Sequence, residues 1–371
     1  MRLVYIANIR LPTEKAHGIQ IMKMCEAFAD NGLEVELLVP RRWNDLYKEP
    51  FDFYKVKKVF KLTWIPCLDL VNFDVARIGF IISTFTFLIF TRIYLFFRPY
   101  DILYTREQFT GLFFRHFIFE LHALPGKISR SFRYLINRAD RLVVLTSFTK
   151  EKLLKLGLAD DKIFVSPDAV DIKEFDIDIS KEEARKKMDL PLDKKIILYT
   201  GSFLLYGWKG SELLPEAAAL LSDDYLFVLV GGHPWELEKM KKTLNLRNTL
   251  LVPYKPHDLM PYYLKAADIL VLPNRRGSDN SELYTSPLKL FEYMASKRPI
   301  IASDLPSLKE VLTEKEALFF VPGSAEDLAK TISRLISDEK LKERLSQRAY
   351  FKVSGYTWDK RADKIIKWIL P

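Results

Sequence analysis

The stretch of sequence that decides the fold reads SPLKLFEYMA and spans residues 286–295. Ser286 is a favourable N-cap residue, and Pro287 suits the first helical position because its missing N–H would be unpaired there anyway. The amides of Leu288 and Lys289 would then point out of the helix end, where the helix dipole favours a phosphate group. We therefore expect a helix that begins at this proline and offers an anion site at its N-terminal end.

The same helix carries a cation and a carboxylate. Lys289 and Glu292 are three residues apart, so they share one face of the helix. Beside a phosphate site this pair suits a nucleotide, because the ammonium would contact phosphate and the carboxylate would accept hydrogen bonds from sugar hydroxyls. The alternative, an ordinary capped helix with a solvated Lys–Glu pair, stays open on this stretch alone.

Length and composition favour two folded domains. The chain has 371 residues, of which 49% are hydrophobic and 13% aromatic, enough for two cores of ~150–200 residues each. Cys25 and Cys67 lack the spacing of a metal site or a disulfide framework. The amino terminus enters an apolar strand without a signal-peptide pattern, so we expect a reduced, cytoplasmic protein.

The formal net charge of +9 indicates an anionic partner, which would be a nucleotide, an anionic lipid surface or a nucleic acid. The sequence contains no zinc-finger, RNP-type or KH-type motif. Its basic residues are scattered and do not form a stripe with interleaved aromatic residues. We therefore expect no nucleic-acid partner.

Short apolar runs alternate with helical patterns along the chain. Most runs are continuous, which is typical of parallel strands covered on both faces, and they predict an α/β protein of two doubly wound, Rossmann-like domains. The predicted domains are residues 1–170 and 171–355, with a charged linker at Asp171–Asp193. Ligands of such sheets bind at the carboxyl ends of the strands, so we expect the site in a cleft that both domains face. The predicted strands are Arg2–Asn8, Glu34–Pro40, Asp101–Thr105, Phe117–Leu121, Arg141–Thr146, Ile163–Pro167, Lys195–Thr200, Leu226–Gly231, Thr249–Pro253, Asp268–Leu272, Pro299–Ser303 and Ala317–Val321.

Two segments after the helix complete the pattern: a buried strand PIIASD at 299–304 and the motif SLKEV at 307–311. Helix, strand and motif together closely resemble the C-terminal signature of the retaining GT-B glycosyltransferases of family 4. The resemblance implies that the helix end binds the diphosphate of a nucleotide sugar and that Glu292 binds the ribose. The family's first glutamate, eight positions earlier, is replaced by Tyr284, and Glu282 is two residues out of register.

The second half holds further matches to the family's donor site. Gly201 and Ser202 follow a strand, and Lys209 matches the lysine that holds the diphosphate in the family. The family's arginine is absent, and Arg275 and Arg276 are candidates to replace it. The donor-binding residues implied by the resemblance are Gly18, Gly201, Ser202, Lys209, Val252, Tyr254, Ser286, Pro287, Leu288, Lys289 and Glu292.

The first half resembles the acceptor domain of the same family. His17 and Gly18 lie between the first strand and a helix, in the place of the family's glycine loop. His122 ends a strand where the family carries a histidine that faces the transferred sugar, which implies a catalytic set of His122, Lys209 and Glu292. Arg106 ends the preceding strand, and the last helix, 356–371, is expected to cross back onto this domain. A hydrogen-bonded turn histidine and a surface arginine are the structural alternatives.

Residues 78–97, IGFIISTFTFLIFTRIYLFF, are long and apolar enough to span a bilayer. Against a span, Arg92 lies within the segment, charged residues flank it, and a strand pattern resumes at Asp101. We expect a helix buried inside its domain. The alternative is a helix partly docked in the membrane interface, which the many aromatic residues and the nearby Arg77 and Arg98 favour.

The resemblance implies a retaining, metal-independent GT-B glycosyltransferase that moves a hexose from a nucleotide-diphosphate sugar and uses no cofactor. The only Asp-x-Asp spacing, at 176–178, lies in the linker, and no cluster of ligands suits zinc. We expect a glycan or lipid-linked acceptor in surface polysaccharide or glycolipid synthesis, and an anionic membrane surface at the inner face as a candidate partner. The alternatives are a transferase with a soluble small-molecule acceptor and an inactive nucleotide-sugar-binding protein.

Overall fold

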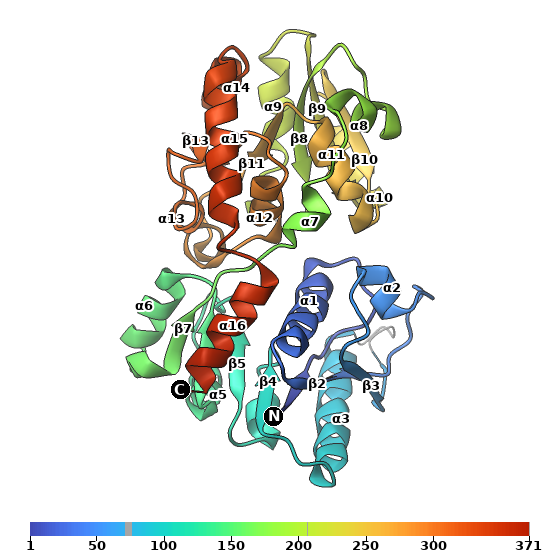
Figure 1. Cartoon of the computed structure of the whole chain (residues 1–371), viewed down its shortest axis with the longest axis vertical. Helices are drawn as coiled ribbons and strands as arrows, with labels where there is room; N and C mark the ends of the chain where they lie inside the picture. The colour runs from blue at the N-terminus through green and yellow to red at the C-terminus, as the bar shows by residue number, and fades with distance from the viewer. Residues whose placement is uncertain (71–75, 206, 371) are drawn as a thin grey trace. The chain divides into compact units, whose positions relative to one another are not determined.

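The computed structural model describes residues 1–70, 76–205 and 207–370, without the side chains of Ala76 and Arg77, and it divides into two compact units (Figure 1). The first unit comprises Met1–Pro167 with Trp358–Pro371, and the second comprises Asp168–Thr357. The chain thus enters the second unit at Asp168, where the sequence predicted residue 171, and leaves it after Thr357, where the sequence predicted 355.

The first unit is built on a seven-stranded parallel sheet with the order β3-β2-β1-β4-β5-β6-β7. Its last helix, α16 (Trp358–Ile369), comes from the end of the chain and packs on α1 (Figure 1). The predicted end of this helix at Pro371 lies outside the described residues. The other elements are β1 (Arg2–Ile6), α1 (Ala16–Asp30), β2 (Glu34–Pro40), α2 (Pro50–Tyr54), β3 (Lys61–Ile65), α3 (Ala76–Phe96), β4 (Ile102–Thr105), α4 (Thr110–Phe113), β5 (Ile118–Leu121), α5 (Arg130–Arg138), β6 (Arg141–Val144), α6 (Ser147–Lys155), η1 (Asp160–Lys162) and β7 (Ile163–Val165).

The second unit is built on a six-stranded parallel sheet with the order β10-β9-β8-β11-β12-β13. Its central strands β8, β9, β11 and β12 are buried on both faces, as the continuous apolar runs predicted. The elements are α7 (Ile172–Phe175), α8 (Lys181–Lys187), β8 (Lys195–Thr200), η2 (Gly207–Lys209), α9 (Leu213–Ala219), β9 (Tyr225–Gly232), α10 (Pro234–Thr243), β10 (Thr249–Pro253), η3 (His257–Leu259), α11 (Met260–Ala266), β11 (Ile269–Leu272), η4 (Asn280–Tyr284), α12 (Leu288–Ala295), β12 (Ile300–Ser303), α13 (Pro306–Lys309), β13 (Ala317–Phe320), α14 (Ala325–Ile336) and α15 (Glu339–Val353).

All the predicted strands form, and their ends agree within two residues, but the sequence analysis missed β3. This strand, KLTWI, lies at the edge of the first sheet and pairs only with β2. Of its five residues only Ile65 is buried. Its sequence KLTWI contains no continuous apolar run, and that run was the signal used to find the others, including the unburied edge strand β10.

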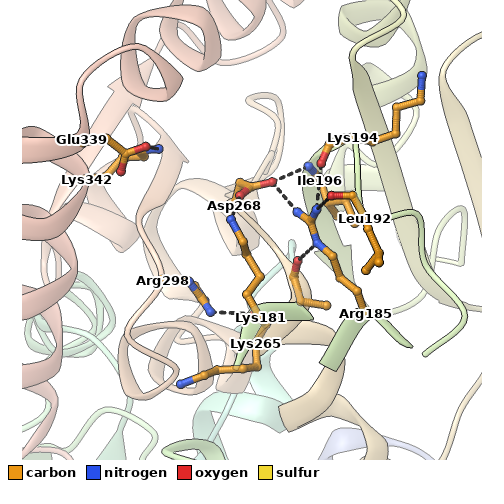
Figure 2. Close-up of polar contacts among 11 residues, drawn as sticks. Lys181, Arg185, Leu192, Lys194, Ile196, Lys265, Asp268, Arg298, Glu339 and Lys342 are labelled. Atoms are coloured by element: carbon orange, nitrogen blue, oxygen red, sulfur yellow. Dashed lines mark hydrogen bonds and ion pairs between the residues drawn. The ribbon is translucent and has the colours of Figure 1, made fainter. Parts of the chain in front are cut away.

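The predicted linker contains a helix that is fastened to the second sheet. Arg185 of α8 is buried and donates to the carbonyls of Ala266, Leu192 and Lys194 at 2.9–3.0 Å. It also pairs with Asp268 at 2.7 Å, next to the start of β11 (Figure 2). Because one guanidinium satisfies three main-chain oxygens and a carboxylate, α8 is part of the second unit and is not a free linker.

The composition of helix α3 predicted that it is buried all round. The structure shows that it is not. Its inner side buries Ser83, Thr84 and Thr91 completely, whereas Phe96 on the outer side is 76% exposed. By length and composition the segment Ile78–Phe96 could cross a membrane, yet 39% of it is buried inside the protein. The expectation of a fully buried helix is therefore wrong, and the helix has one packed face and one exposed face.

Candidate functional site

Two lysine side chains meet at the carboxyl end of β8, a central strand of the second sheet. Lys209 ends η2, and its Nζ donates to Ser202 Oγ at 2.9 Å. Lys289, in the first turn of α12, donates to the carbonyl of Thr200 at 3.0 Å, and its Nζ lies 3.8 Å from the ring centre of Tyr199. Thr200 is the last residue of β8, so both ammonium groups are held beside the end of this strand.

The loop after β8 passes close to the start of α12. Gly201 has a φ of 124°, a conformation that favours glycine, and an added Cβ would lie 3.5 Å from Lys289 Nζ. The chain runs outward from β8 to β10 on one side and from β11 to β13 on the other, so the strand order reverses between β8 and β11. Doubly wound sheets bind ligands at the carboxyl ends of the strands at such a switch point.

Burial makes both ammonium groups costly to keep charged. It lowers the pKa of Lys209 to about 8. It also holds the pKa of Lys289 well below its ordinary value, and the nearby positive charge of Lys209 lowers it further. Two buried cations that repel each other are stabilised by an anion with more than one negative charge, such as a diphosphate.

Helix α12 begins one residue later than predicted, at Leu288. Pro287 is the N-cap residue with extended backbone, and the Oγ of Ser286 accepts a hydrogen bond from the Asp168 amide at 3.1 Å. The prediction that Ser286 caps the helix is therefore wrong, because this hydroxyl is bonded to the main chain at the entry to the unit. The amides of Leu288 and Lys289 occupy the first two helical positions, which have no acceptor within their own helix.

Glu292 lies one turn further along α12 and is held by a histidine that sequence reasoning missed. Its Oε1 lies 2.8 Å from Nε2 of His257, which is in η3. The imidazole also packs edge-on against Phe175, with ring centres 5.6 Å apart. Because His257 and Glu292 are 35 positions apart, no local spacing could have joined them.

The loop that carries Ser202 is held by a second residue that sequence reasoning missed. The carboxylate of Glu236 in α10 is buried and accepts hydrogen bonds from the amides of Leu204 at 2.5 Å, Leu205 at 2.7 Å and His233 at 2.8 Å. Two of these charge-assisted bonds, to Leu204 and Leu205, fix the loop next to Ser202, the partner of Lys209.

Arg275 and Arg276, named from the sequence as replacements for the family's arginine, differ in their surroundings. Arg275 pairs with Glu212 at 3.0 Å, so its guanidinium is engaged by a carboxylate, and Arg276 is exposed. The cation that lies beside Lys209 is Lys289, which therefore takes the place proposed from the sequence for the two arginines.

Four other positions named from the sequence are placed as follows. Tyr284 is buried in η4, and the carboxylate of Glu282 accepts from the Gly277 amide at 2.8 Å within its own loop. Val252 lies at a register shift between β9 and β10, and the Tyr254 amide donates to the carbonyl that ends β9.

In the first unit, a buried carboxylate organises the residues around His122. Glu120 lies at the carboxyl end of β5 and accepts from four side chains. These are Arg361 at 2.8 Å, Gln20 at 2.8 Å, Tyr104 at 2.6 Å and the His122 Nε2 at 2.6 Å. Arg361 comes from α16, so the end of the chain completes the cluster. His122 is thus held by the buried carboxylate of Glu120, a partner that the sequence analysis did not predict.

The cluster extends to the other acceptor candidates. Arg106 donates to Gln20 at 2.5 Å. Burial, followed by the charges of Arg106, Lys15 and His122, lowers the pKa of His17 to about 4, so His17 is neutral at physiological pH. The structure therefore brings His17, Arg106 and His122 within electrostatic reach of one another.

Gly18 is a glycine for a reason other than the one expected. It lies in the first turn of α1 and not in a loop, and a Cβ there would lie 2.1 Å from the hydroxyl of Tyr54. That hydroxyl in turn bonds both the amide and the carbonyl of Thr13, at 2.7 and 2.8 Å. Packing inside the first unit accounts for the absence of a side chain at this position.

Comparison with known proteins agrees with this geometry. The family model of glycosyl transferases group 1 matches residues 180–352, and that of Glycosyltransferase Family 4 matches residues 18–174. The chain is 27% identical over 222 residues to TuaC of Bacillus subtilis, named as a teichuronic acid biosynthesis glycosyltransferase. That match covers 60% of this chain and 53% of TuaC, so the chain spans about half the length of the curated relative.

Solved structures share the fold over the full chain. A sucrose-phosphate synthase from Thermosynechococcus elongatus superposes with a TM-score of 0.81 at 19% identity, covering 100% of this chain and 98% of that one. HepE of Anabaena, solved in complex with UDP-glucose, superposes with a TM-score of 0.77 at 14% identity, covering 100% and 99%. The two parallel sheets and these matches define a GT-B fold. The chain belongs to the group 1 glycosyltransferases.

Proposed function

We propose that this protein transfers a hexose from a nucleotide-diphosphate sugar to a glycan or lipid-linked acceptor in the synthesis of a surface polysaccharide or glycolipid. The observation that carries the proposal is the pair of half-buried ammonium groups, Lys209 and Lys289, at the switch point of the second sheet. The UDP-glucose bound to the structural neighbour HepE and the polysaccharide role named for TuaC support the donor and acceptor classes.

In this proposal the second unit stabilises the leaving group. The bond between the sugar anomeric carbon and the diphosphate breaks, and its electron pair leaves with the diphosphate. The charge that develops is met by Lys209, Lys289 and the free amides at the start of α12, which are fixed before the reaction. Glu292, oriented by His257, accepts hydrogen bonds from the ribose hydroxyls.

The acceptor oxygen forms the new bond to the anomeric carbon on the face that the diphosphate leaves, and its proton passes to the leaving phosphate. Retention therefore requires no side-chain base at the acceptor. We assign His122 to contact with the transferred sugar, and His17 and Arg106 to the acceptor. The Glu120 carboxylate orients His122. Two ammonium groups already compensate the diphosphate, which is why we propose a transfer that requires no metal ion.

Thermal-shift measurements with UDP, GDP, ADP and dTDP test the donor assignment. One nucleoside diphosphate is expected to raise the melting temperature, since binding to the native state alone stabilises it. The rise should be lost in Lys209→Met and Lys289→Met and kept in Arg275→Gln. If none of the four raises the melting temperature of the wild type, the donor assignment is wrong.

Turnover is tested separately, because Tyr284 stands where the family has its first glutamate. Hydrolysis of the matching nucleotide sugar, with and without a chelator, distinguishes an enzyme from an inactive binding protein. Proton NMR of a transfer product gives the anomeric configuration, and an inverted product would contradict retention.

A further inference from the structure

Helix α3 presents a row of apolar side chains to the solvent, while its packed side buries Ser83, Thr84 and Thr91 together with Phe87 and Leu88. Its outer face carries Ile78, Ile81, Ile89, Ile93 and Phe96, and Phe97 follows directly, each of them exposed. We refer to these six residues as the α3 apolar face. The spacing of three, four and eight positions places them along one side of the helix.

The buried side of α3 has an equally specific composition. Ser83 Oγ accepts from Arg42 Nε at 2.9 Å, and Thr84 Oγ1 accepts from the Asn8 amide at 2.9 Å. These hydrogen bonds fasten the polar side of the helix to the loops after β1 and β2. The helix cannot turn its apolar face inward without breaking them, so the exposure of the isoleucines and phenylalanines is built into the fold. Contiguous apolar surface of this kind marks an interaction site.

Positive charge is concentrated around this face. Residues 76–139 contain nine Lys and Arg residues but only three Asp and Glu residues, so they hold six of the nine net charges of the chain. Two of the acids are engaged inside the unit, since Glu120 bonds four side chains and Glu107 accepts from Asn8 at 2.7 Å. The third, Asp101, accepts from the Arg2 amide at 2.7 Å.

The exposed arginines of this region lie on α3 and α5 and on the segments that directly follow α3 and α4. α4 packs against α3, and α5 packs against α4. Right-handed crossovers from β3 through β6 place these three helices on the same face of the sheet. The exposed cations, which we call the basic rim, are Arg92, Arg98, Arg115, Arg130 and Arg133.

We propose that the α3 apolar face and the basic rim dock the first unit onto an anionic lipid bilayer, with α3 lying in the interface and the protein on the cytoplasmic side. Apolar residues with aromatic rings on one side and cations beside them are the features of a helix that lies on a membrane. Bilayer lipids supply both the apolar layer and the negative headgroups that this composition requires.

Other occupants fit less well. A two-fold contact with a second copy would bring the basic rims of both copies together, and like charges repel. A helix that crosses the bilayer would have to leave the sheet, exposing the buried Phe87 and Leu88 and breaking the bonds of Ser83 and Thr84. Interfacial docking leaves the unit intact.

Co-sedimentation of the full-length protein with vesicles tests this proposal without any donor or acceptor. The protein should bind phosphatidylcholine vesicles that contain about 30% phosphatidylglycerol, and it should bind pure phosphatidylcholine at least tenfold more weakly. Salt at about 0.5 M should weaken binding, since it screens the basic rim.

Paired variants separate the two components of the surface. Ile93→Ser with Phe96→Ser should weaken vesicle binding at least tenfold, whereas the control Val321→Ser with Phe351→Ser, exposed apolar residues of the second unit, should not change it. Arg130→Gln with Arg133→Gln should weaken binding about fivefold per charge, and the matched pair Lys239→Gln with Lys242→Gln should not.

Equal binding by the wild type and the Ile93/Phe96 variant would contradict the proposal, as would equal binding to neutral vesicles. Sedimentation velocity gives the other contrary result: a dimer that dissociates in the Ile93/Phe96 variant would identify a second copy as the occupant. Because no nucleotide is present, failure here leaves the donor assignment untouched.

Discussion

Each unit buries a cluster of charged side chains, and the two clusters differ in how the charge is compensated. In the first unit, burial would raise the pKa of Glu120, but Arg361 and His122 hold it well below its ordinary value. In the second unit, burial lowers the pKa of Lys209 to about 8, and its neighbour Lys289 is shifted in the same direction.

The difference separates a charge that stabilises the fold from charges that bind a ligand. Four side chains of the protein surround the Glu120 carboxylate, so the folded chain supplies its own counter-charge. The two lysines donate to the neutral oxygens of Ser202 and Thr200, and the charges of Glu236 and Glu292 offset the cost of their burial only in part. The folded protein is therefore less stable without ligand, and an anionic ligand would stabilise it by compensating the two positive charges.

The largest effect is expected from breaking the compensated cluster. Glu120→Ala leaves the Arg361 guanidinium buried without its carboxylate and should lower the stability of the first unit by about 3–5 kcal/mol. Urea unfolding with hydrogen exchange of β5 measures this loss, and Glu34→Ala, at an exposed position of β2, is the control. A loss below about 1 kcal/mol would mean that the cluster is not a stabilising one.

Removing a charge from the lysine pair of the second unit should have the opposite effect on stability. Lys289→Met eliminates a buried cation, so the ligand-free protein should be as stable as the wild type or more so. Its affinity for the responsive nucleoside diphosphate should fall by about 1.5–3 kcal/mol, or ~10–150-fold. Calorimetry measures both quantities, and unchanged affinity would remove Lys289 from the site.

A smaller effect is expected at the ribose. Glu292→Gln keeps the shape of the side chain but removes its charge, and it should weaken binding of the ribonucleotide about tenfold. The 2′-deoxy analogue should lose less, since it offers one hydroxyl fewer to the carboxylate. Equal losses for both nucleotides would place Glu292 away from the sugar, and His257→Asn should reproduce part of the effect because it frees the carboxylate.

The smallest effect is on pH dependence. The pKa of Lys209 is about 8 in the folded protein and near 10.5 when unfolded. The unfolded chain therefore holds the extra proton between these values, and the ligand-free protein should gain stability as pH rises through that window. Diphosphate affinity should move the other way, falling about threefold from pH 7.5 to 8.5. Titrations in buffers of different ionisation enthalpy should show proton uptake on binding, and less of it in Lys209→Met, where only the shifted Lys289 remains.

The sequence was sufficient for most of the fold because parallel strands buried on both faces appear as continuous apolar runs. It was insufficient for β3, whose edge position leaves four of its five residues unburied. It was also misleading for α3, since the mostly apolar composition of residues 78–97 does not reveal that Ser83 and Thr84 turn inward while Phe96 turns out. That orientation depends on Arg42 and Asn8, which are distant in the chain.

The residues of the candidate site also divide into those that the sequence predicted and those that only the structure revealed. The spacing of Lys289 and Glu292 on one helix, and the lysine at 209, were predicted from local patterns. His257, Glu236 and Arg361 were not, because each acts on a partner 31 to 241 positions away. The sequence also could not show that Arg275, one of the two arginines named as replacement cations, pairs with Glu212 in the folded unit.

The sequence by itself determined the two alternating α/β halves. It also determined that Lys289 and Glu292 share one helix. Both features depend on residues that are neighbours along the chain. Only the tertiary structure decided which charges are neutralised, which remain available to an anion, and which side of α3 is exposed. Burial and pairing are properties of residues brought together from distant positions, and no local pattern encodes them.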